Sequence, residues 1–244
     1  MSGKIFIGTS GWSYKDWKNK FYPKSLKNSA WLNFYADHFN TVEVNNSFYQ
    51  LPSKKSLKKW LKKVPSDFVF SVKASRYITH LKKLKNPKNS LKRFLKRMEY
   101  LNAKKGPILF QLPPNWHVDA KRLENFIKLL LNQTKDQDYV FEFRNKAWLK
   151  ENIRSILRKF NIGFCINDMV DENIDWITSN FVYIRFHGPS GNYKNSYNSD
   201  FLKEWAEKVK DWKSNLDQVF IYFNNDIKAH AIKNAKQFQQ YLNK

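Results

Sequence analysis

The sequence has a single cysteine, Cys165, and no long uninterrupted hydrophobic run. One cysteine excludes an internal disulfide, and its setting in Gly163-Phe164-Cys165-Ile166 indicates a core position rather than a reactive thiol. No stretch approaches the roughly 18 apolar residues that a membrane span needs. The first residues also lack the apolar segment and cleavage site of a signal peptide. These absences predict a cytoplasmic protein with no membrane partner.

Acidic residues are scarce, with 21 Asp and Glu against 44 Lys and Arg, so the formal net charge is +23. Such an excess favours an anionic small molecule or nucleic acid as partner. Lysine far outnumbers arginine, however, and many lysines fall on one side of a helical pattern. In 53–63 they surround an apolar stripe that includes Leu57 and Trp60, as on the solvated face of an ordinary helix. The charge alone leaves nucleic-acid binding and composition bias both open, and it does not predict an oligomeric state.

Eight short runs rich in β-branched and aromatic residues are predicted strands: 4–10, 41–45, 68–75, 108–113, 139–144, 162–168, 181–187 and 219–225. Helical patterns lie between or after them, near 28–39, 53–63, 88–102, 119–132, 148–159, 199–215 and 228–242. The segment 169–180 is too short and polar for a full helix. The pattern predicts an α/β fold, a single (β/α)8 TIM-barrel-like domain over 1–244 with an irregular sixth β-α unit.

Glycine is also scarce, with 7 in the chain. The rival fold, a doubly wound open sheet, normally brings a glycine-rich first turn for a dinucleotide. Gly8-Thr9-Ser10-Gly11 does not fit that fingerprint, so no nucleotide-cofactor motif is present. The barrel remains the predicted fold, and the cofactor stays unknown.

Polar residues occupy alternate positions near the C-terminal ends of several predicted strands. In 41–45 the valines face the helices, which turns Glu43 and Asn45 toward the barrel interior. Strands of parallel sheets are normally apolar throughout, and an unpaired buried charge costs several kcal/mol. Because barrel enzymes have their active sites at this C-terminal mouth, we predict a polar site there. The alternative is an internal salt-bridge network, for example Glu142 with Arg185, that only fills the barrel.

The chemistry of the mouth allows more than one ligand. Arginine and lysine suit a phosphate or carboxylate, two carboxylates beside a histidine suit proton transfer, and loop aromatics suit stacking on a base or sugar. The predicted catalytic residues are Glu43, Glu142 and His187. The predicted substrate-binding residues are Asn45, Lys73, His80, Gln111, Arg144, Arg185, Asn224, Trp12 and Tyr14. A divalent metal also stays open, although no local ligand spacing supports it, with the candidate ligands Glu43, Glu142, Asp168 and His187.

Seven ordered blocks of the chain resemble the YecE-like family, the domain of unknown function 72: IGTSGWSYKDW with FYP, FNTVEVNNSFYQLP, FVFSVKAS with ITH, GPILFQLPP, FEFRNKAW, YIRFHG, and YFNND with AHAIKNA. The resemblance covers nearly the whole chain and implies a TIM-barrel-like fold, but it implies no activity. It implies polar pocket positions at Glu43, Asn45, Lys73, His80, Gln111, Glu142, Arg144, Arg185, His187, Asn224 and Asn225, the last of which is an additional substrate-binding candidate. The family often has His at the position of Asn145, so a role for that position is not carried over.

Three functions follow from these observations. The first is an enzyme acting on a phosphate-bearing or nucleic-acid substrate, a hydrolase of phosphate esters, with the anion held by arginine and lysine. The second is a glycoside-type hydrolase with Glu43 and Glu142 as its carboxylate pair. The third is a non-catalytic nucleic-acid-binding protein that uses the lysine-rich helices 53–63 and 82–97.

Overall fold

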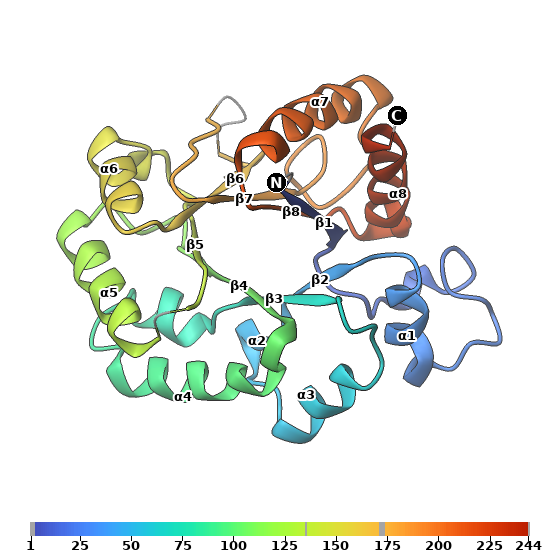
Figure 1. Cartoon of the computed structure of the whole chain (residues 1–244), viewed down its shortest axis with the longest axis horizontal. Coiled ribbons are helices and arrows are strands. Elements are labelled where there is room, and N and C mark those ends of the chain that lie inside the picture. The colour runs from blue at the N-terminus through green and yellow to red at the C-terminus, as the bar shows by residue number, and fades with distance from the viewer. Residues whose placement is uncertain (1–2, 135, 171–173, 244) are drawn as a thin grey trace.

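The computed structural model describes residues 3–134, 136–170 and 174–243. Its strands form the ring at the centre of Figure 1: β1 (Lys4–Thr9), β2 (Thr41–Val44), β3 (Val69–Lys73), β4 (Lys105–Gln111), β5 (Tyr139–Glu142), β6 (Gly163–Asn167), β7 (Phe181–Phe186) and β8 (Gln218–Phe223). They pair in parallel in the order β1-β8-β7-β6-β5-β4-β3-β2. This arrangement confirms the predicted TIM-barrel-like fold, and each predicted strand is present with ends shifted by at most a few residues.

Helices surround the ring: α1 (Trp31–Ala36), α3 (Lys54–Leu61), α4 (Lys88–Met98), α5 (Ala120–Gln133), α6 (Glu151–Lys159), α7 (Ser199–Asn215) and α8 (His230–Leu242). Ser53 and Asp119 cap α3 and α5, because each side chain accepts a hydrogen bond from the backbone N–H three residues later. Between β6 and β7 the described residues contain no helix, which agrees with the predicted irregular sixth unit. No helix in the described part of the chain is long and apolar enough to cross a membrane.

Successive residues of each strand belong in turn to two separate hydrophobic layers, one inside the barrel and one between the strands and the helices. The inner layer fills the barrel with eight buried side chains: Phe6, Leu109, Val140, Cys165, Phe181, Tyr183, Phe220 and Tyr222. Residues of opposite parity, such as Val42 and Val44, pack against the helices in the larger outer cluster. Cys165 is therefore a core residue, as its sequence setting predicts. The two layers follow from the period of two along a strand, which also turns Glu43 inward.

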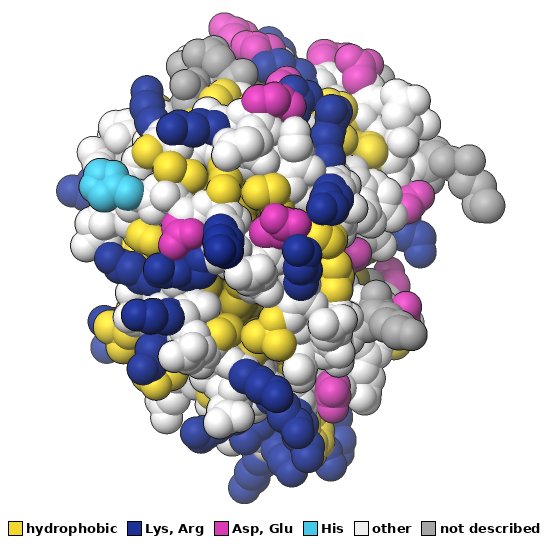
Figure 2. All heavy atoms as spheres, turned by 90° about the vertical axis from the view of Figure 1, so that its left-hand side faces the viewer, with side chains coloured by type: hydrophobic (Ala, Val, Ile, Leu, Met, Phe, Trp, Pro, Cys, Tyr) yellow, Lys and Arg dark blue, Asp and Glu magenta, His cyan; other side chains and the backbone are white. Residues whose placement is uncertain are grey.

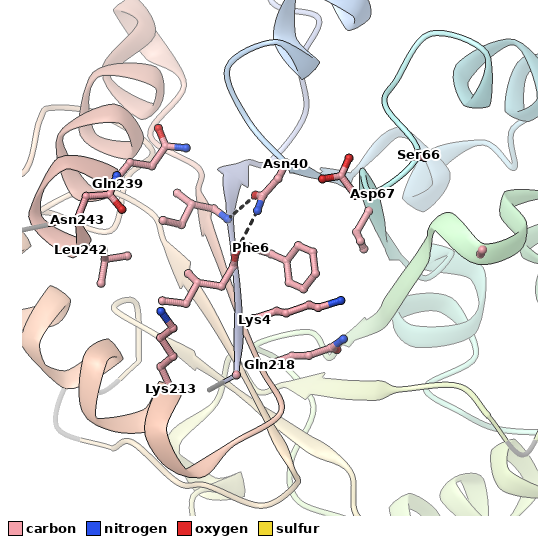
Figure 3. Close-up of a pocket in the computed structure, with 15 residues that line it drawn as sticks. Lys4, Phe6, Asn40, Ser66, Asp67, Lys213, Gln218, Gln239, Leu242 and Asn243 are labelled. Carbon is pink, nitrogen blue, oxygen red and sulfur yellow. Dashed lines mark hydrogen bonds between the residues drawn. The ribbon is translucent and has the colours of Figure 1, made fainter. Parts of the chain in front are cut away.

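The seam between β1 and β2 is closed mainly by side chains, with one strand-like bridge between Ser10 and Glu43. The carboxamide of Asn40 accepts from the backbone N–H of Ile7 at 3.1 Å and donates to the carbonyl of Ile5 at 2.9 Å, as Figure 3 shows. The Tyr35 hydroxyl accepts from the Thr9 N–H at 2.8 Å and donates to the Thr41 carbonyl at 3.0 Å. These bonds supply the backbone pairing that a regular ladder would otherwise provide.

Candidate functional site

One buried arginine, Arg185 on β7, links two carboxylates inside the mouth of the barrel. Its Nη1 donates to Oε2 of Glu142 at 2.6 Å, and its Nε and Nη2 donate to Oε1 of Glu43 at 3.2 and 2.9 Å. All three side chains are at most 1% exposed. The pair that the sequence suggested between Glu142 and Arg185 is present, and Glu43 extends it into a network.

The carboxylate of Glu43 is saturated with hydrogen-bond donors. Besides Arg185, Oε1 accepts from the Ser10 hydroxyl at 2.7 Å and Oε2 accepts from the Tyr183 hydroxyl at 2.7 Å. Burial on its own raises the pKa of Glu43, but Arg185 and the two hydroxyl groups outweigh burial and lower the pKa. A carboxylate held ionised by this many donors is a poor proton donor.

Glu142 on β5 is held by a second arginine. The Nε of Arg144 pairs with Oε1 of Glu142, and Nη2 of Arg144 lies 2.8 Å from Nε2 of His187. Burial raises the pKa of Glu142, but Arg144 and Arg185 together lower it well below its usual range. A glycosidase needs one carboxylic acid with a raised pKa, so two ionised, arginine-bound glutamates do not support the glycoside-type alternative.

His187 is fixed at both ring nitrogens. Its Nδ1 lies 2.9 Å from Oδ1 of Asp168, whose other oxygen accepts from the Tyr197 hydroxyl. Burial is the main effect that lowers the pKa of His187 to about 4, with Arg185 and Arg144 adding to it. The neutral ring then donates from Nδ1 to Asp168 and accepts at Nε2 from Arg144. The third predicted catalytic residue is thus engaged within the protein, and Asp168 orients it.

The four side chains considered as metal ligands do not form a metal site. Glu43 and Glu142 bind arginines, and Asp168 binds His187. Within the ranges that the structure describes, no group of three or more His, Cys, Asp or Glu side chains could hold a metal ion. The donor set therefore does not support the metal alternative.

Lys73 and His80 both contact the ring of Phe48 at the mouth. The Nζ of Lys73 lies 4.3 Å from the ring centroid, and the His80 ring meets it edge-on at 4.9 Å. Burial, reinforced by Arg185, lowers the pKa of Lys73 to about 7. Burial, reinforced by Lys73, lowers the pKa of His80 to about 4. At neutral pH, Lys73 is therefore only partly protonated and His80 is neutral.

Asp226, which follows β8, belongs to the mouth although the sequence did not mark it as a site residue. The Asn224 carboxamide, in the orientation that satisfies its neighbours, donates to Oδ2 of Asp226 at 3.1 Å and accepts from Nη2 of Arg185 at 3.2 Å. Oδ1 of Asp226 has no partner among the described residues. Burial raises the pKa of Asp226 to about 8, against the opposing effects of Tyr14 and Arg185. The mouth thus holds a carboxyl group that is mostly protonated at pH 7.

Replacing Asp226 by asparagine is expected to stabilise the protein at neutral and alkaline pH. Between its ordinary pKa of 3.8 and its folded pKa of about 8, the unfolded chain loses a proton that the folded chain keeps. The wild-type stability therefore falls as pH rises through this window, and the amide removes that loss. We expect the variant to gain about 1.4 kcal/mol or more at pH 8 relative to pH 4, the free energy of one pKa unit. Urea unfolding at the two pH values measures the difference.

The matched control for this prediction is Asp200→Asn on α7, because the Asp200 side chain is 92% exposed. Its stability should follow the wild type across the same pH range. If Asp226→Asn also followed the wild type, the raised pKa of Asp226 would be wrong.

Three predicted substrate-binding residues meet at a small hollow of about 190 Å³ between the loops after β1 and β2. Its lining includes Trp12, Tyr14 and Asn45. Oδ1 of Asn45 is buried and has no partner among the residues described. Gln111 pairs in register with Glu142, and in the described structure its carboxamide makes no hydrogen bond. Asn45 and Gln111 are therefore polar groups available to a ligand.

The side-chain nitrogens of Asn225 and Asn145 are occupied by structural contacts, whereas Oδ1 of Asn225 is buried and has no partner among the described residues. The amide of Asn225 donates to the carbonyl of Asn195 at 2.8 Å and to Oδ1 of Asn234 at 2.9 Å. Asn145 donates to the Pro114 carbonyl at 2.9 Å and accepts from the N–H two residues later. Asn225, placed in the pocket by the family resemblance, thus ties the loop after β7 to α8.

The exposed large hydrophobic side chains of the described chain all lie in loops that leave the C-terminal ends of strands. They are Tyr49 after β2, Tyr77 and Leu81 after β3, Met169 after β6, Tyr193 after β7 and Ile227 after β8. We call these six residues the rim. Because parallel strands end at the same side of a barrel, the rim surrounds the mouth. Exposed aromatic side chains around a polar site are typical of surfaces that stack on bases or sugars.

A larger hollow, of about 900 Å³, lies at the opposite end of the barrel (Figure 3). It is lined by the N-terminal residues of β1, β3 and β8 and by the ends of α7 and α8. Asp67, Lys4 and Lys213 are among its charged residues. No hydrogen bond or ion pair joins their side chains in the described structure. The N-terminal end of such a barrel normally serves stability, so we place the candidate site at the mouth.

Lysine and arginine side chains are spread over the face seen in Figure 2, with acidic side chains among them. The lysine and arginine side chains are densest at the lower end of this face, at the height that α3 and α4 have in Figure 1. On these helices the apolar side, with Leu57 and Leu91 buried, faces the core, and the lysines face solvent. This arrangement is that of ordinary amphipathic helices.

Comparison with known proteins gives one family over nearly the whole chain. A family model described as "Protein of unknown function DUF72" matches residues 6–244. The UPF0759 protein YunF of Bacillus subtilis is 27% identical over 98% of this chain and 94% of its own length. The UPF0759 protein YecE of Escherichia coli is 32% identical, but over only 45% of this chain and 38% of its own length.

Solved structures agree in fold. A DUF72 family protein from Thermotoga maritima is 29% identical and superposes with a TM-score of 0.87, covering 99% of this chain and 100% of that one. A D-psicose 3-epimerase from Clostridium cellulolyticum superposes with a TM-score of 0.60 at 12% identity, covering 98% of this chain and 97% of the epimerase. At that identity, the second likeness shows the barrel alone.

Proposed function

Because the chain belongs to the family of proteins of unknown function DUF72, we propose its function from the mouth of the barrel alone. The proposal is an enzyme that binds a phosphate-bearing substrate, a nucleotide or a nucleic-acid end, and hydrolyses a phosphate ester. The phosphate would lie against Arg144, and the base or sugar against the tyrosines of the rim.

The observation that carries this proposal is the set of contacts that the Arg144 guanidinium makes. Its Nε and Nη2 have partners inside the protein, but among the residues that the structure describes Nη1 meets only the sulfur of Met169. A thioether is a weak acceptor, and Met169 is an exposed member of the rim. A phosphate oxygen in its place would receive a charge-assisted hydrogen bond. Arg185, by contrast, is saturated by carboxylates and supports the site instead of binding the anion.

Proton transfer in this proposal falls to groups other than the three predicted catalytic residues. The partners of Glu43 and Glu142 lower the pKa values of these carboxylates, and burial lowers the pKa of His187, so all three pKa values lie away from neutrality. Lys73 and Asp226 have pKa values of about 7 and about 8. Because general acids and bases work best with a pKa near the working pH, Lys73 and Asp226 suit that role.

The Arg144→Met variant is expected to bind adenosine 5′-monophosphate about tenfold or more weakly than the wild type. The reason is the loss of a hydrogen bond to a charged group, which contributes about 1.5–3 kcal/mol. Titration calorimetry at two salt concentrations measures the affinity, and a thermal melt checks folding.

The matched control is Arg93→Met, the same change on the exposed side of α4. It should leave the affinity unchanged. If Arg93→Met weakened binding and Arg144→Met did not, the anion would bind at the outer helices, and the mouth would not be the site.

A further inference from the structure

Lys73 is the charged side chain of the mouth that lacks a counter-ion. It ends β3, its side chain is half-buried, and within the described residues its Nζ makes no hydrogen bond or ion pair. Its contact is with the ring of Phe48, at 4.3 Å from the centroid. The neighbouring carboxylates of Glu43 and Glu142 are already taken by Arg185 and Arg144.

The surroundings of Lys73 favour the neutral amine. Burial removes water from the ammonium group, and the guanidinium of Arg185 repels it more than either Glu142 or Glu43 alone attracts it. Arg144 adds to the repulsion, and His80, the remaining titratable neighbour, is itself neutral at pH 7. A neutral lysine amine with no hydrogen bond has a lone pair available for attack on an electrophile.

We infer that Lys73 is a covalent nucleophile that condenses with an aldehyde or ketone group of the substrate to form a Schiff base. The inference rests on the position of Lys73 at the C-terminal end of a barrel strand, on the absence of a partner for its Nζ among the described residues, and on the nearby Arg144 donor that meets only a thioether. The chemical class of substrate is a carbonyl compound with a phosphate group, such as a sugar phosphate in its open-chain form. The phosphate part of this assignment rests on the proposed function, whereas the covalent step does not.

The step balances without an oxidant or reductant. The lone pair of Nζ attacks the carbonyl carbon, a C–N bond forms, and the C=O π pair moves to oxygen. A proton passes from nitrogen to that oxygen, which gives a carbinolamine. The hydroxyl group and the remaining N–H proton of the carbinolamine then leave together as water, which forms the C=N bond of a neutral imine.

Pyridoxal and pyridoxal 5′-phosphate are matched probes, because both carry an aldehyde and only one carries a phosphate. Each is incubated with the whole protein at pH 7, the imine is reduced with borohydride, and the modified peptide is identified by mass spectrometry. We expect Lys73 to be labelled at least roughly tenfold faster than the exposed lysines, because an amine with a pKa of about 7 is neutral at pH 7 far more often than an ordinary lysine amine. Labelling spread evenly over surface lysines would overturn the inference, and this measurement needs no variant.

Two variants and a pH series sharpen the test. Lys73→Arg should abolish the fast labelling, and Lys54→Met should preserve it. Lys54 serves as the control because its Nζ also lies over an aromatic ring, at 5.0 Å from the centroid, but on the surface. The labelling rate should rise with a midpoint near pH 7, the pKa of Lys73. Fast labelling that survives in Lys73→Arg, or a rate that rises only near pH 10, would overturn the assignment.

The two probes separate this inference from the proposed function. If pyridoxal 5′-phosphate labels Lys73 faster than pyridoxal does, and Arg144→Met removes only that advantage, both stand. If the two probes label Lys73 equally fast, the Schiff base stands and the phosphate site at Arg144 fails. If neither labels Lys73 but Arg144 still governs nucleotide affinity, the covalent inference fails alone.

Discussion

The Arg185→Met variant is expected to lose about 3–5 kcal/mol of folding free energy, the cost of breaking a buried ion pair from one side. Methionine fills much of the same space, so the loss would come from charge and not from a cavity. Glu43 and Glu142 would remain buried at 0% exposure without the guanidinium that neutralises them. Urea unfolding at pH 7 measures the loss.

The pH dependence of this loss has a definite sign. In the wild type both glutamates have folded pKa values below the ordinary 4.5, so their contribution is present above pH 4.5 and is lost as pH falls through the folded values. Without Arg185, burial would raise the pKa of Glu43, whereas Arg144 would still oppose burial at Glu142, so the variant would lose stability as pH rises above about 4.5 mainly through Glu43. The difference from wild type should therefore be larger at pH 7 than at pH 4.

Two further variants make the test specific to the network. Arg154→Met removes a partly exposed arginine that pairs with the exposed Glu151 at 3.3 Å, and it should cost less than about 1 kcal/mol. Adding Glu43→Gln and Glu142→Gln to Arg185→Met should restore part of the loss, because the amides carry no charge. A loss below 1 kcal/mol for Arg185→Met alone would show that the network does not support the fold.

The Gly8→Ala variant is expected to lose about 3 kcal/mol or more of folding free energy, because the added methyl group would push β1 and β2 apart. A Cβ on Gly8 would lie 2.1 Å from the Thr41 carbonyl oxygen and 2.9 Å from the Tyr35 hydroxyl. Neither group can withdraw easily, since Tyr35 bridges the Thr9 N–H and the Thr41 carbonyl. Thermal and urea unfolding measure the loss, and hydrogen exchange at Thr9 should report the opened seam.

The control for Gly8 is Gly191→Ala, the same change in the loop after β7. Gly191 has a φ of +65°, so alanine there costs about 1–2 kcal/mol through the backbone, but the nearest atom to its Cβ would be 3.5 Å away. A Gly8→Ala variant no less stable than Gly191→Ala would show that the seam tolerates separation.

Much of the fold could be predicted because it depends on neighbours in the sequence. The alternation in 41–45 placed the valines outward and Glu43 inward, as observed, because strand residues face opposite sides in turn. The weak pattern in 169–180 predicted an irregular sixth unit for the same local reason, and the described residues of that segment contain no helix. The helix predicted near 53–63 agrees with α3, which starts at Lys54.

The sequence predicted which residues lie in the candidate site better than it predicted which of them contact one another. The alternation of side chains along the strands placed Glu142, Arg144 and Arg185 in the mouth. It could not show that Arg185 binds both glutamates or that one nitrogen of Arg144 meets only a thioether. Asp226 was missed, although it shares the parity of Asn224 at the end of β8. Its position just past the strand was the available signal.

The sequence by itself determined the order of strands and helices, the inward parity of the polar residues and the basic excess of the chain, because each depends on residue types and local periodicity. Only the tertiary structure decided which charges neutralise one another and which group is left without a partner. The hydroxyl of Tyr183 reaches Glu43 across 140 residues of sequence. Desolvation and Coulomb interactions act over such contacts, so Lys73 becomes only partly protonated and Asp226 mostly protonated at neutral pH only once the barrel has closed.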